Sequence, residues 1–279
     1  MMPFRCIFLF LFQSLAISIY GQNHLNIDPA KVSDNFLKID YFNSIWLKSA
    51  DINKDDAAGF TRRASEKIEK GFYEEAYSDI SSAIKLRPDY GLPFLLKGIY
   101  FLHRNMVDSA EVSLKQSLAI DSLDVRTMFY LGLTRLYSKD YEGAKSFFRK
   151  INKVDDNDCR GYYGLATVEL EKGNYNAGRN LMKKAVNIDS KFVQAVFSLG
   201  IMDLMENNIK SAEDNMDQIV SADPGFAPAW FIKGLIKSMD VSKIKASFNC
   251  FNKAIELEPT NISYLSARIS AYRKLVMLD

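Results

Sequence analysis

The sequence predicts an all-α fold built from repeated pairs of helices. A small residue recurs every 34 positions, at Ala64, Gly98, Gly132, Ala166, Gly200 and Gly234. Each of these positions lies in a stretch with helical apolar spacing, where a glycine costs about 1 kcal/mol relative to alanine. Close approach of a second helix offsets that cost, because a side chain at this place would hold the two backbones apart. The period therefore predicts one closely packed helix pair per 34 residues.

A second set of small residues lies twelve positions after the first, and a large apolar residue follows each of them four positions later. The small residues are Ala76, Ala110, Ala144, Gly178, Ala212 and, one position late, Ser247. The large ones are Ile80, Leu114, Phe148, Met182, Met216 and Phe251. This spacing is typical of an amphipathic helix. Each unit then closes with an acidic or proline-containing turn, such as Ile120-Asp121-Ser122 or Leu86-Arg87-Pro88, and a proline there stops a helix.

The N-terminus, residues 1–21, has the layout of a secretory signal peptide. A single charge, Arg5, precedes apolar runs that are much shorter than the roughly 20 residues of a membrane-spanning helix. Cleavage is expected after Gly21, with Ser18 as the alternative, and an uncleaved segment bound at a membrane interface is the other interpretation. We therefore expect an exported protein, periplasmic or secreted, with no integral membrane span.

Residues 22–56 lie outside the 34-residue period and form a predicted linker with one amphipathic helix. Ser33-Asp34 is a suitable helix start, and the apolar residues of the helix are Leu37, Tyr41, Phe42, Ile45 and Trp46. Three interpretations stay open: a lid over the first repeat, a tether that docks on a partner or lies in the protein's own groove, and disorder.

The repeated pattern resembles the tetratricopeptide repeat (TPR) family, whose unit is a pair of antiparallel helices. The clearest unit contains Met128-x-x-Leu131-Gly132 followed by Tyr141, Ala144 and Phe148. Six units are expected: 57–90, 91–124, 125–158, 159–192, 193–226 and 227–261, the last with one extra residue around Asp240 to Lys243. The first departs from the pattern, with Arg63 and Lys67 at usually apolar places. A solenoid over 57–261 and a capping helix over 262–279 follow.

The resemblance implies a right-handed α-solenoid with a concave groove, lined by the first helix of each pair. In this family the fifth place of each unit points into the groove; here these residues are Leu95, Phe129, Tyr163, Phe197 and Phe231. They predict an exposed apolar strip that binds a partner, with Arg126 and Arg160 at its edge. Packing alone is the competing interpretation. The next places, which in relatives that grip acidic chaperone tails carry lysine and asparagine, hold Leu96, Tyr130, Gly164, Ser198 and Ile232, so that activity is not expected.

Composition and charge restrict the function. A net charge of +2 is far from the basic excess of a nucleic-acid-binding protein, and two histidines leave little for metal or nucleophilic catalysis. The acidic run Asp51 to Asp56 fails as a calcium loop because Arg62 stands where a glutamate is needed. We expect no enzyme, metal or cofactor, and Cys159 and Cys250 unpaired.

These observations predict an exported, non-enzymatic protein–protein interaction scaffold that binds an apolar peptide or helix segment in its concave groove. The alternative is a carrier or sensor of a small apolar or glycan ligand in the same groove. The sequence predicts a protein or peptide partner and leaves the oligomeric state undetermined.

Overall fold

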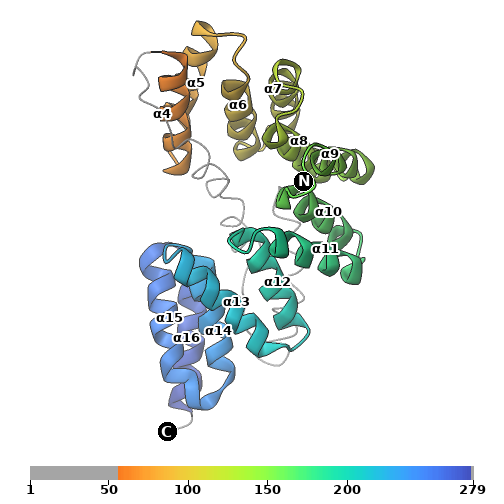
Figure 1. Ribbon diagram of the computed structural model, residues 1–279. Helices are drawn as coiled ribbons and strands as arrows, with labels where there is room; N and C mark the ends of the chain where they lie inside the picture. The colour runs from red at the N-terminus through yellow and green to blue at the C-terminus, as the bar shows by residue number, and fades with distance from the viewer. Residues whose placement is uncertain (1–55, 278–279) are drawn as a thin grey trace. The chain divides into compact units, whose positions relative to one another are not determined.

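The computed structural model describes residues 56–277, and these form thirteen α-helices, one short 3-10 helix and no strand (Figure 1). The all-α prediction is confirmed. The predicted signal peptide and almost all of the N-terminal linker lie outside the described residues. The first helices of the pairs are α4 (Ala57–Glu69), α6 (Gly91–His103), α8 (Val125–Tyr137), α10 (Cys159–Glu171), α12 (Val193–Met205) and α14 (Ala227–Met239). The second helices are α5 (Tyr73–Leu86), α7 (Val107–Ile120), α9 (Tyr141–Val154), α11 (Tyr175–Ile188), α13 (Ile209–Ala222) and α15 (Ile244–Leu257).

The helices begin where the 34-residue period places the units. Each predicted unit starts with a first helix at its first residue, and a last helix, α16 (Ile262–Val276), follows the sixth. The extra residue expected near Asp240 belongs to the 3-10 helix η1 (Val241–Lys243), which replaces the usual inner turn of the sixth pair.

The described residues form two compact units, 56–172 and 173–277. The first holds α4 to α10 and the second α11 to α16, so the division falls within the fourth predicted pair. Inside each unit, a first helix packs on the second helix of its own pair, and that second helix packs on the next first helix. No helix of the described residues has the length and apolar character needed to cross a membrane.

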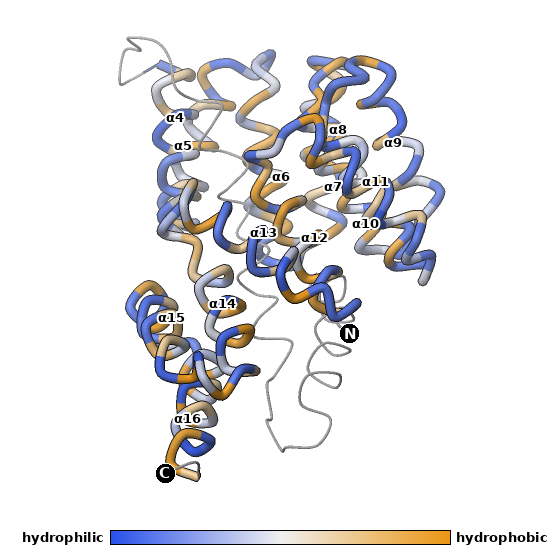
Figure 2. The backbone as a smooth tube through the Cα atoms, turned by 60° about the horizontal axis from the view of Figure 1, so that its bottom comes forward, coloured by the Kyte–Doolittle hydropathy of each residue, from blue (hydrophilic) through white to orange (hydrophobic). Residues whose placement is uncertain are grey.

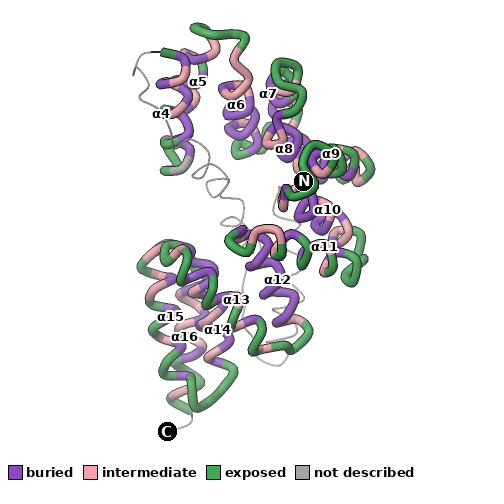
Figure 3. Tube along the Cα trace, viewed as in Figure 1, coloured by how far each residue is buried: buried purple, intermediate pink, exposed green. Residues whose placement is uncertain are grey.

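Close packing of the helix pairs explains the glycine period. A Cβ atom added at Gly132 would lie 2.5 Å from Cε1 of Phe148, and one added at Gly98 would lie 2.5 Å from Cγ of Leu114. Leu114 and Phe148 are two of the large apolar residues predicted from the second period, and both are fully buried. The prediction that glycine permits close approach of the second helix is confirmed. Figure 3 shows the resulting buried faces between the helices of each unit.

The turns inside the pairs repeat with the same period. The second residue after the end of each of the first five first helices has left-handed backbone, with φ between 59° and 79°: Gly71, Asn105, Lys139, Gly173 and Asn207. This conformation closes the helix end, for example through the bonds from Gly71 N to Ile68 O and from Phe72 N to Lys67 O. The turns between pairs repeat too, because Asp121, Asp155, Asp189 and Asp223 each accept the backbone N–H two residues on.

The first pair departs from the repeat pattern for a reason that the structure shows. Asp79 on α5 is buried, and both unusual cations of α4 pair with it, Arg63 at 3.3 Å and Lys67 at 2.7 Å. A buried carboxylate needs such partners. The two charged residues at usually apolar places of α4 therefore form one ionic cluster with Asp79 inside the first pair.

The junctions between successive pairs repeat over a spacing of 24 residues. A residue of each second helix contacts a residue of the next first helix, and four junctions are ion pairs: Glu111–Arg135, Lys145–Glu169, Arg179–Asp203 and Glu213–Lys237. At this spacing the two outermost contacts are aromatic instead, Tyr77–Phe101 with ring centroids 6.0 Å apart and Phe248–Tyr272 at 6.4 Å. We call these six contacts the junction series.

Candidate functional site

The five residues predicted to form an exposed apolar strip are buried. Leu95 is 2%, Phe129 1%, Tyr163 7%, and Phe197 and Phe231 0% exposed. The prediction of an exposed strip at the fifth places is therefore wrong. Binding by these side chains stays a prediction without the support of an exposed surface.

Contacts across neighbouring helices explain this burial. The ring of Phe129 on α8 lies 5.9 Å from that of Phe148 on α9 and 6.3 Å from that of Tyr163 on α10. In the other unit, the ring of Phe231 lies 6.2 Å from Phe251 and 4.8 Å from Tyr264. A fifth-place side chain thus fills the space between its own second helix and the next first helix. These contacts stabilise the stacking of the pairs.

The sixth places are buried as well. Leu96, Tyr130, Ser198 and Ile232 are at most 2% exposed. A Cβ atom added at Gly164 would overlap the ring of Phe148 on the preceding second helix, as would one added at Gly132. The Phe148 ring therefore lies between two glycines, one from its own pair and one from the next. The sixth place of α10 serves packing between pairs.

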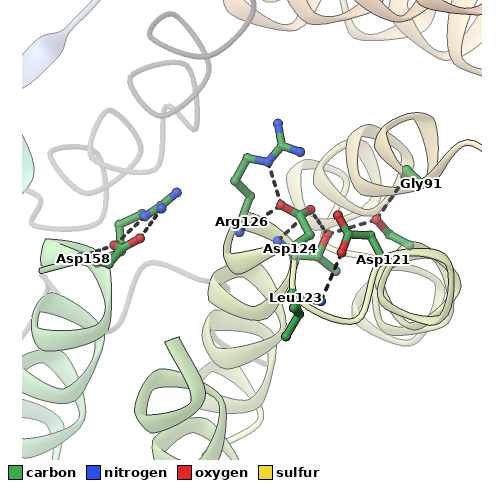
Figure 4. A network of polar contacts seen from close by, with 9 residues as sticks. Gly91, Asp121, Leu123, Asp124, Arg126 and Asp158 are labelled. Carbon is green, nitrogen blue, oxygen red and sulfur yellow. Dashed lines mark hydrogen bonds and ion pairs between the residues drawn. The ribbon is translucent and has the colours of Figure 1, made fainter. Parts of the chain in front are cut away.

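The two predicted edge residues, Arg126 and Arg160, keep partly exposed side chains, at 28% and 14%. Each is anchored in the same way, since its Nε donates to the helix-capping aspartate two residues before it, at 2.7 Å from Asp124 and Asp158 respectively. Each aspartate also accepts the backbone N–H of its arginine and so begins the helix. The repeated Asp-x-Arg unit, which we call the cap pair, holds the guanidinium groups at the starts of α8 and α10 (Figure 4).

A buried hydroxyl network fixes the first of these cap pairs to the helices around it. Oδ2 of Asp124 accepts from the Thr127 hydroxyl at 2.6 Å, and Thr127 shares a 2.9 Å hydrogen bond with Ser117 on α7. Ser117 in turn donates to the backbone oxygen of Gly91, 2.9 Å away at the start of α6 (Figure 4). Three helices therefore set the position of the Arg126 guanidinium.

A partly exposed stripe on α8 continues from this arginine. Arg126, Leu133 and Tyr137 are spaced seven and four residues apart, so they share one face of the helix, and all three side chains are partly exposed. We call these three residues the α8 stripe. It combines one cation with apolar surface and is the accessible counterpart, in the first unit, of the strip expected at the fifth places.

Cys250 is one of the two described cysteines and has a shifted pKa. Burial raises the pKa of the Cys250 thiol, so this group is a neutral thiol at pH 7 and not a nucleophilic thiolate. No disulfide joins Cys159 and Cys250. Within the described residues, no group of three or more histidine, cysteine or carboxylate side chains could hold a metal ion.

Comparison with known proteins now supports the repeat pattern directly. The family model of the tetratricopeptide repeat matches residues 160–192, which is almost exactly the fourth predicted unit without its first residue. This match covers one unit of the repeat, and the helix pairs in register extend the same pattern along the described residues. The paired helices are those of a TPR solenoid, a fold that provides scaffolds for protein–protein interaction.

Solved TPR structures share this fold at low sequence identity. The Cut9–Hcn1 hetero-tetramer of the APC/C matches 97% of the chain at 12% identity with a TM-score of 0.61, and the chain spans about half, 53%, of that protein's length. Pseudomonas aeruginosa pilF matches 77% of the chain and 97% of its own length at 13% identity, with a TM-score of 0.56. A thermophilic TPR protein of Thermus thermophilus matches 67% of the chain and 99% of its own length at 15% identity, with a TM-score of 0.52. A comparison with curated proteins finds no match.

The sequence interpretation missed the function of the aspartates and the junction series. Asp124 and Asp158 were visible 34 residues apart, each two positions before a predicted edge arginine, and that spacing is the signal for the cap pair. The four ionic members of the junction series were visible as pairs 24 residues apart with opposite charge. Neither the cap pair nor these four ion pairs are apolar, so a search for apolar periodicity does not find them.

Proposed function

We propose that this TPR protein is an exported, non-enzymatic scaffold that binds an apolar peptide or helix segment of a protein partner along its first helices. The α8 stripe would receive the segment in the first unit, with Arg126 and Arg160 next to a carboxylate of the partner. The observation that carries the proposal is the repeated cap pair, which holds two partly exposed cations at the starts of successive first helices.

The chemistry of the stripe favours an apolar segment with a carboxylate. Leu133 and Tyr137 offer apolar contact, while a guanidinium can recognise a carboxylate with two parallel hydrogen bonds. Because Asp124 and Asp158 already fix the orientation of the arginines, binding would cost little side-chain entropy there. Because the fifth-place residues are buried, their role in this proposal is to stabilise the helix stack and not to contact the partner.

The test compares a variant of the two edge arginines with a matched surface variant. Arg126→Gln/Arg160→Gln removes two cations at the proposed site, and Arg149→Gln/Lys150→Gln removes two exposed cations of α9. Proteins that co-purify from the source cell envelope would be quantified by mass spectrometry. We expect one partner to be recovered by the wild type and by the α9 variant, and to be lost from the Arg126/Arg160 variant.

Equal recovery by both variants, with circular dichroism showing intact folds, would contradict the proposed site. Truncation of Phe129 or Phe197 would not test the site, because loss of these buried rings would disturb the helix stack itself. A peptide from the recovered partner, with and without its carboxylate, would then measure the contribution of the charge.

Export is the second part of the proposal and rests on the layout of residues 1–21. Expression of the full chain in its source cell, followed by fractionation and N-terminal sequencing, tests it. A mature N-terminus after Gly21 or Ser18 in the exported fraction supports export. A chain that keeps Met1 and stays in the cytoplasm contradicts it.

The alternative, a carrier of a small apolar or glycan ligand, is not favoured. Stacking on such a ligand requires an exposed aromatic face, and the fifth-place rings are buried.

A further inference from the structure

The last described helix, α16, carries an exposed apolar stripe on its outer face. Its residues follow one another by three, four, three and four positions, the spacing of the a and d positions of a coiled-coil seam: Ile262, Leu265, Ile269, Tyr272 and Val276. Ile262 and Val276 are each 55% exposed, Ile269 is 52% and Tyr272 is 59%, while Leu265 is half-buried. We call these five residues the α16 stripe.

The opposite face of α16 already attaches the helix to the protein. Tyr264 is fully buried with its ring 4.8 Å from that of Phe231 on α14, and Ala267 and Ala271 are buried on the same face. Figure 2 shows hydrophobic and hydrophilic segments alternating along α16, as a two-faced helix requires. The buried face therefore attaches α16, and of the α16 stripe only Tyr272 adds a ring contact, with Phe248 of α15.

The repeat register relates Ile269 on this face to an equivalent position in the preceding first helix. Ile269 stands 35 residues after Gly234, the position that the period and the one extra residue of the sixth pair give for the next glycine. In α14 that glycine lets the second helix approach, since a Cβ atom at Gly234 would lie 2.6 Å from Cδ1 of Phe251. Ile269 thus stands at the position that receives the second helix in the pairs of Gly98, Gly132, Gly200 and Gly234, with isoleucine in place of the glycine.

Isoleucine at this place changes the kind of helix that can bind. A helix in contact with Ile269 must lie further away than in the tight pairs, and its side chains would enter between those of the stripe as in a coiled coil. Exposed apolar residues in such a continuous row usually mark an interaction surface.

The charge around the stripe selects the partner. Residues 262–276 include Arg268, Arg273 and Lys274 and no acidic residue. Within the described part of the chain none of the three forms an ion pair; Arg268 contacts the amide oxygen of Asn252 and Lys274 the backbone oxygen of Ser238, both at 2.9 Å. In the heptad register Arg268 and Arg273 flank the seam, so a second copy of α16 would bring arginine next to arginine. Acidic flanks on a different helix complement them.

We propose that the α16 stripe is a docking site for an amphipathic helix of a partner protein, with apolar residues along its seam and acidic residues beside it. The surface is separate from the α8 stripe and independent of the function proposed for it. Binding there would place the partner helix where the second helix of a seventh pair would lie.

The test uses a designed, fluorescently labelled helical peptide of about three heptads with isoleucine and leucine at the seam and glutamate beside it. A second peptide carries lysine in place of every glutamate. Binding to the full-length protein would be measured by fluorescence anisotropy. We expect the acidic peptide to bind about tenfold or more tightly than the basic one, and to lose affinity between about 0.05 and 0.5 M salt because the charges are screened.

Two substitutions connect the binding to the stripe. Ile269→Ser should weaken the acidic peptide by about tenfold or more, whereas Val112→Ser, at a similarly exposed apolar residue of α7, should leave it unchanged. Arg273→Glu should weaken the acidic peptide and strengthen the basic one. Ile269 and Arg273 are both exposed, so circular dichroism should show the wild-type fold for each variant.

Three outcomes would overturn the proposal. The first is equal affinity for the two peptides, and the second is binding that Ile269→Ser does not weaken. The third is self-association of the wild type, seen by analytical ultracentrifugation and abolished by Ile269→Ser, because it would make a second copy of the chain the occupant of the stripe.

Discussion

The inner and outer members of the junction series share one geometry and differ in chemistry. All six join residues 24 positions apart, yet the inner four are ion pairs and the outer two are pairs of aromatic rings. Burial also differs, because the two central ion pairs have side chains at most 16% exposed, whereas the Glu213–Lys237 pair is about one quarter exposed. The backbone arrangement of a repeat therefore does not dictate the side chains that join it to the next.

The order of the charges along the chain shows what the ionic junctions contribute to the packing of the repeats. Along the chain the second helix contributes Glu111, Lys145, Arg179 and Glu213 in turn, and the sign changes twice. If a second helix packed on the first helix one repeat too far along, Glu111 would meet Glu169 and Arg179 would meet Lys237. Like charges in a partly buried contact are unfavourable. The ionic junctions thus favour the correct order of repeats, which the aromatic junctions cannot do.

Loss of one buried charge should break an inner junction and leave an outer one nearly intact. Asp203 is buried and accepts hydrogen bonds from Ser211 at 2.6 Å and Asn215 at 3.0 Å besides its pairing with Arg179. Asp203→Ala should lower the free energy of unfolding by about 3 kcal/mol, because partners stay buried without the carboxylate. Tyr272→Ala, at an exposed outer junction, should cost less than about 1 kcal/mol. Urea unfolding followed by circular dichroism measures both.

Replacing the glycine at the contact inside a helix pair by a larger residue tests whether the loss of stability stays in that pair or also reaches the junction with the next pair. Gly132→Leu should lower the free energy of unfolding by about 1–3 kcal/mol or more, because its side chain would overlap the Phe148 ring. Because the same ring also touches Gly164 of the next pair, the loss should spread to that junction. Hydrogen exchange would show weakened protection in α10 as well as in α8 and α9. An unchanged unfolding midpoint would mean that the repeat register is wrong.

Exchanging the two charges of one ionic junction tests whether opposite charges at that junction stabilise the fold. In the Lys145–Glu169 pair the Nζ and Oε1 atoms lie 2.5 Å apart. Lys145→Glu alone and Glu169→Lys alone should each destabilise the fold, since each places like charges together. The double variant restores opposite charges, so its loss should be smaller than the sum of the two single losses by about 0.5–3 kcal/mol. Additive losses in thermal unfolding would show that the sign of this junction does not matter.

The backbone was more predictable from the sequence than the surface. The glycine period placed every helix pair, because the tight contact between Gly132 and Phe148 depends only on residue size and spacing. The exposure of Phe129 was not predictable in this way, since the same spacing places a side chain on a groove or between two helices. Whether the side chain is exposed or buried depends on how closely neighbouring pairs approach each other. For Phe129 this approach is set by Gly164, a residue of the next repeat. The positive φ of Lys139 was likewise hidden, because only its place in the period, and not its residue type, indicates it.

Glu171 at the end of α10 offers the smallest and most specific test, one of pH dependence. Burial raises the pKa of this carboxyl, and the nearby Lys139 only partly opposes the shift. The folded state therefore holds the proton more tightly than the unfolded chain, so its contribution to stability is complete below the unfolded pKa of about 4.3 and is lost as the pH rises through the folded pKa. Glu171→Gln should raise the thermal unfolding midpoint slightly at pH 7 and leave it unchanged near pH 3. An equal effect at both pH values would assign the change to packing, whereas a decrease at pH 7 would mean that the ionised carboxylate stabilises this end of α10.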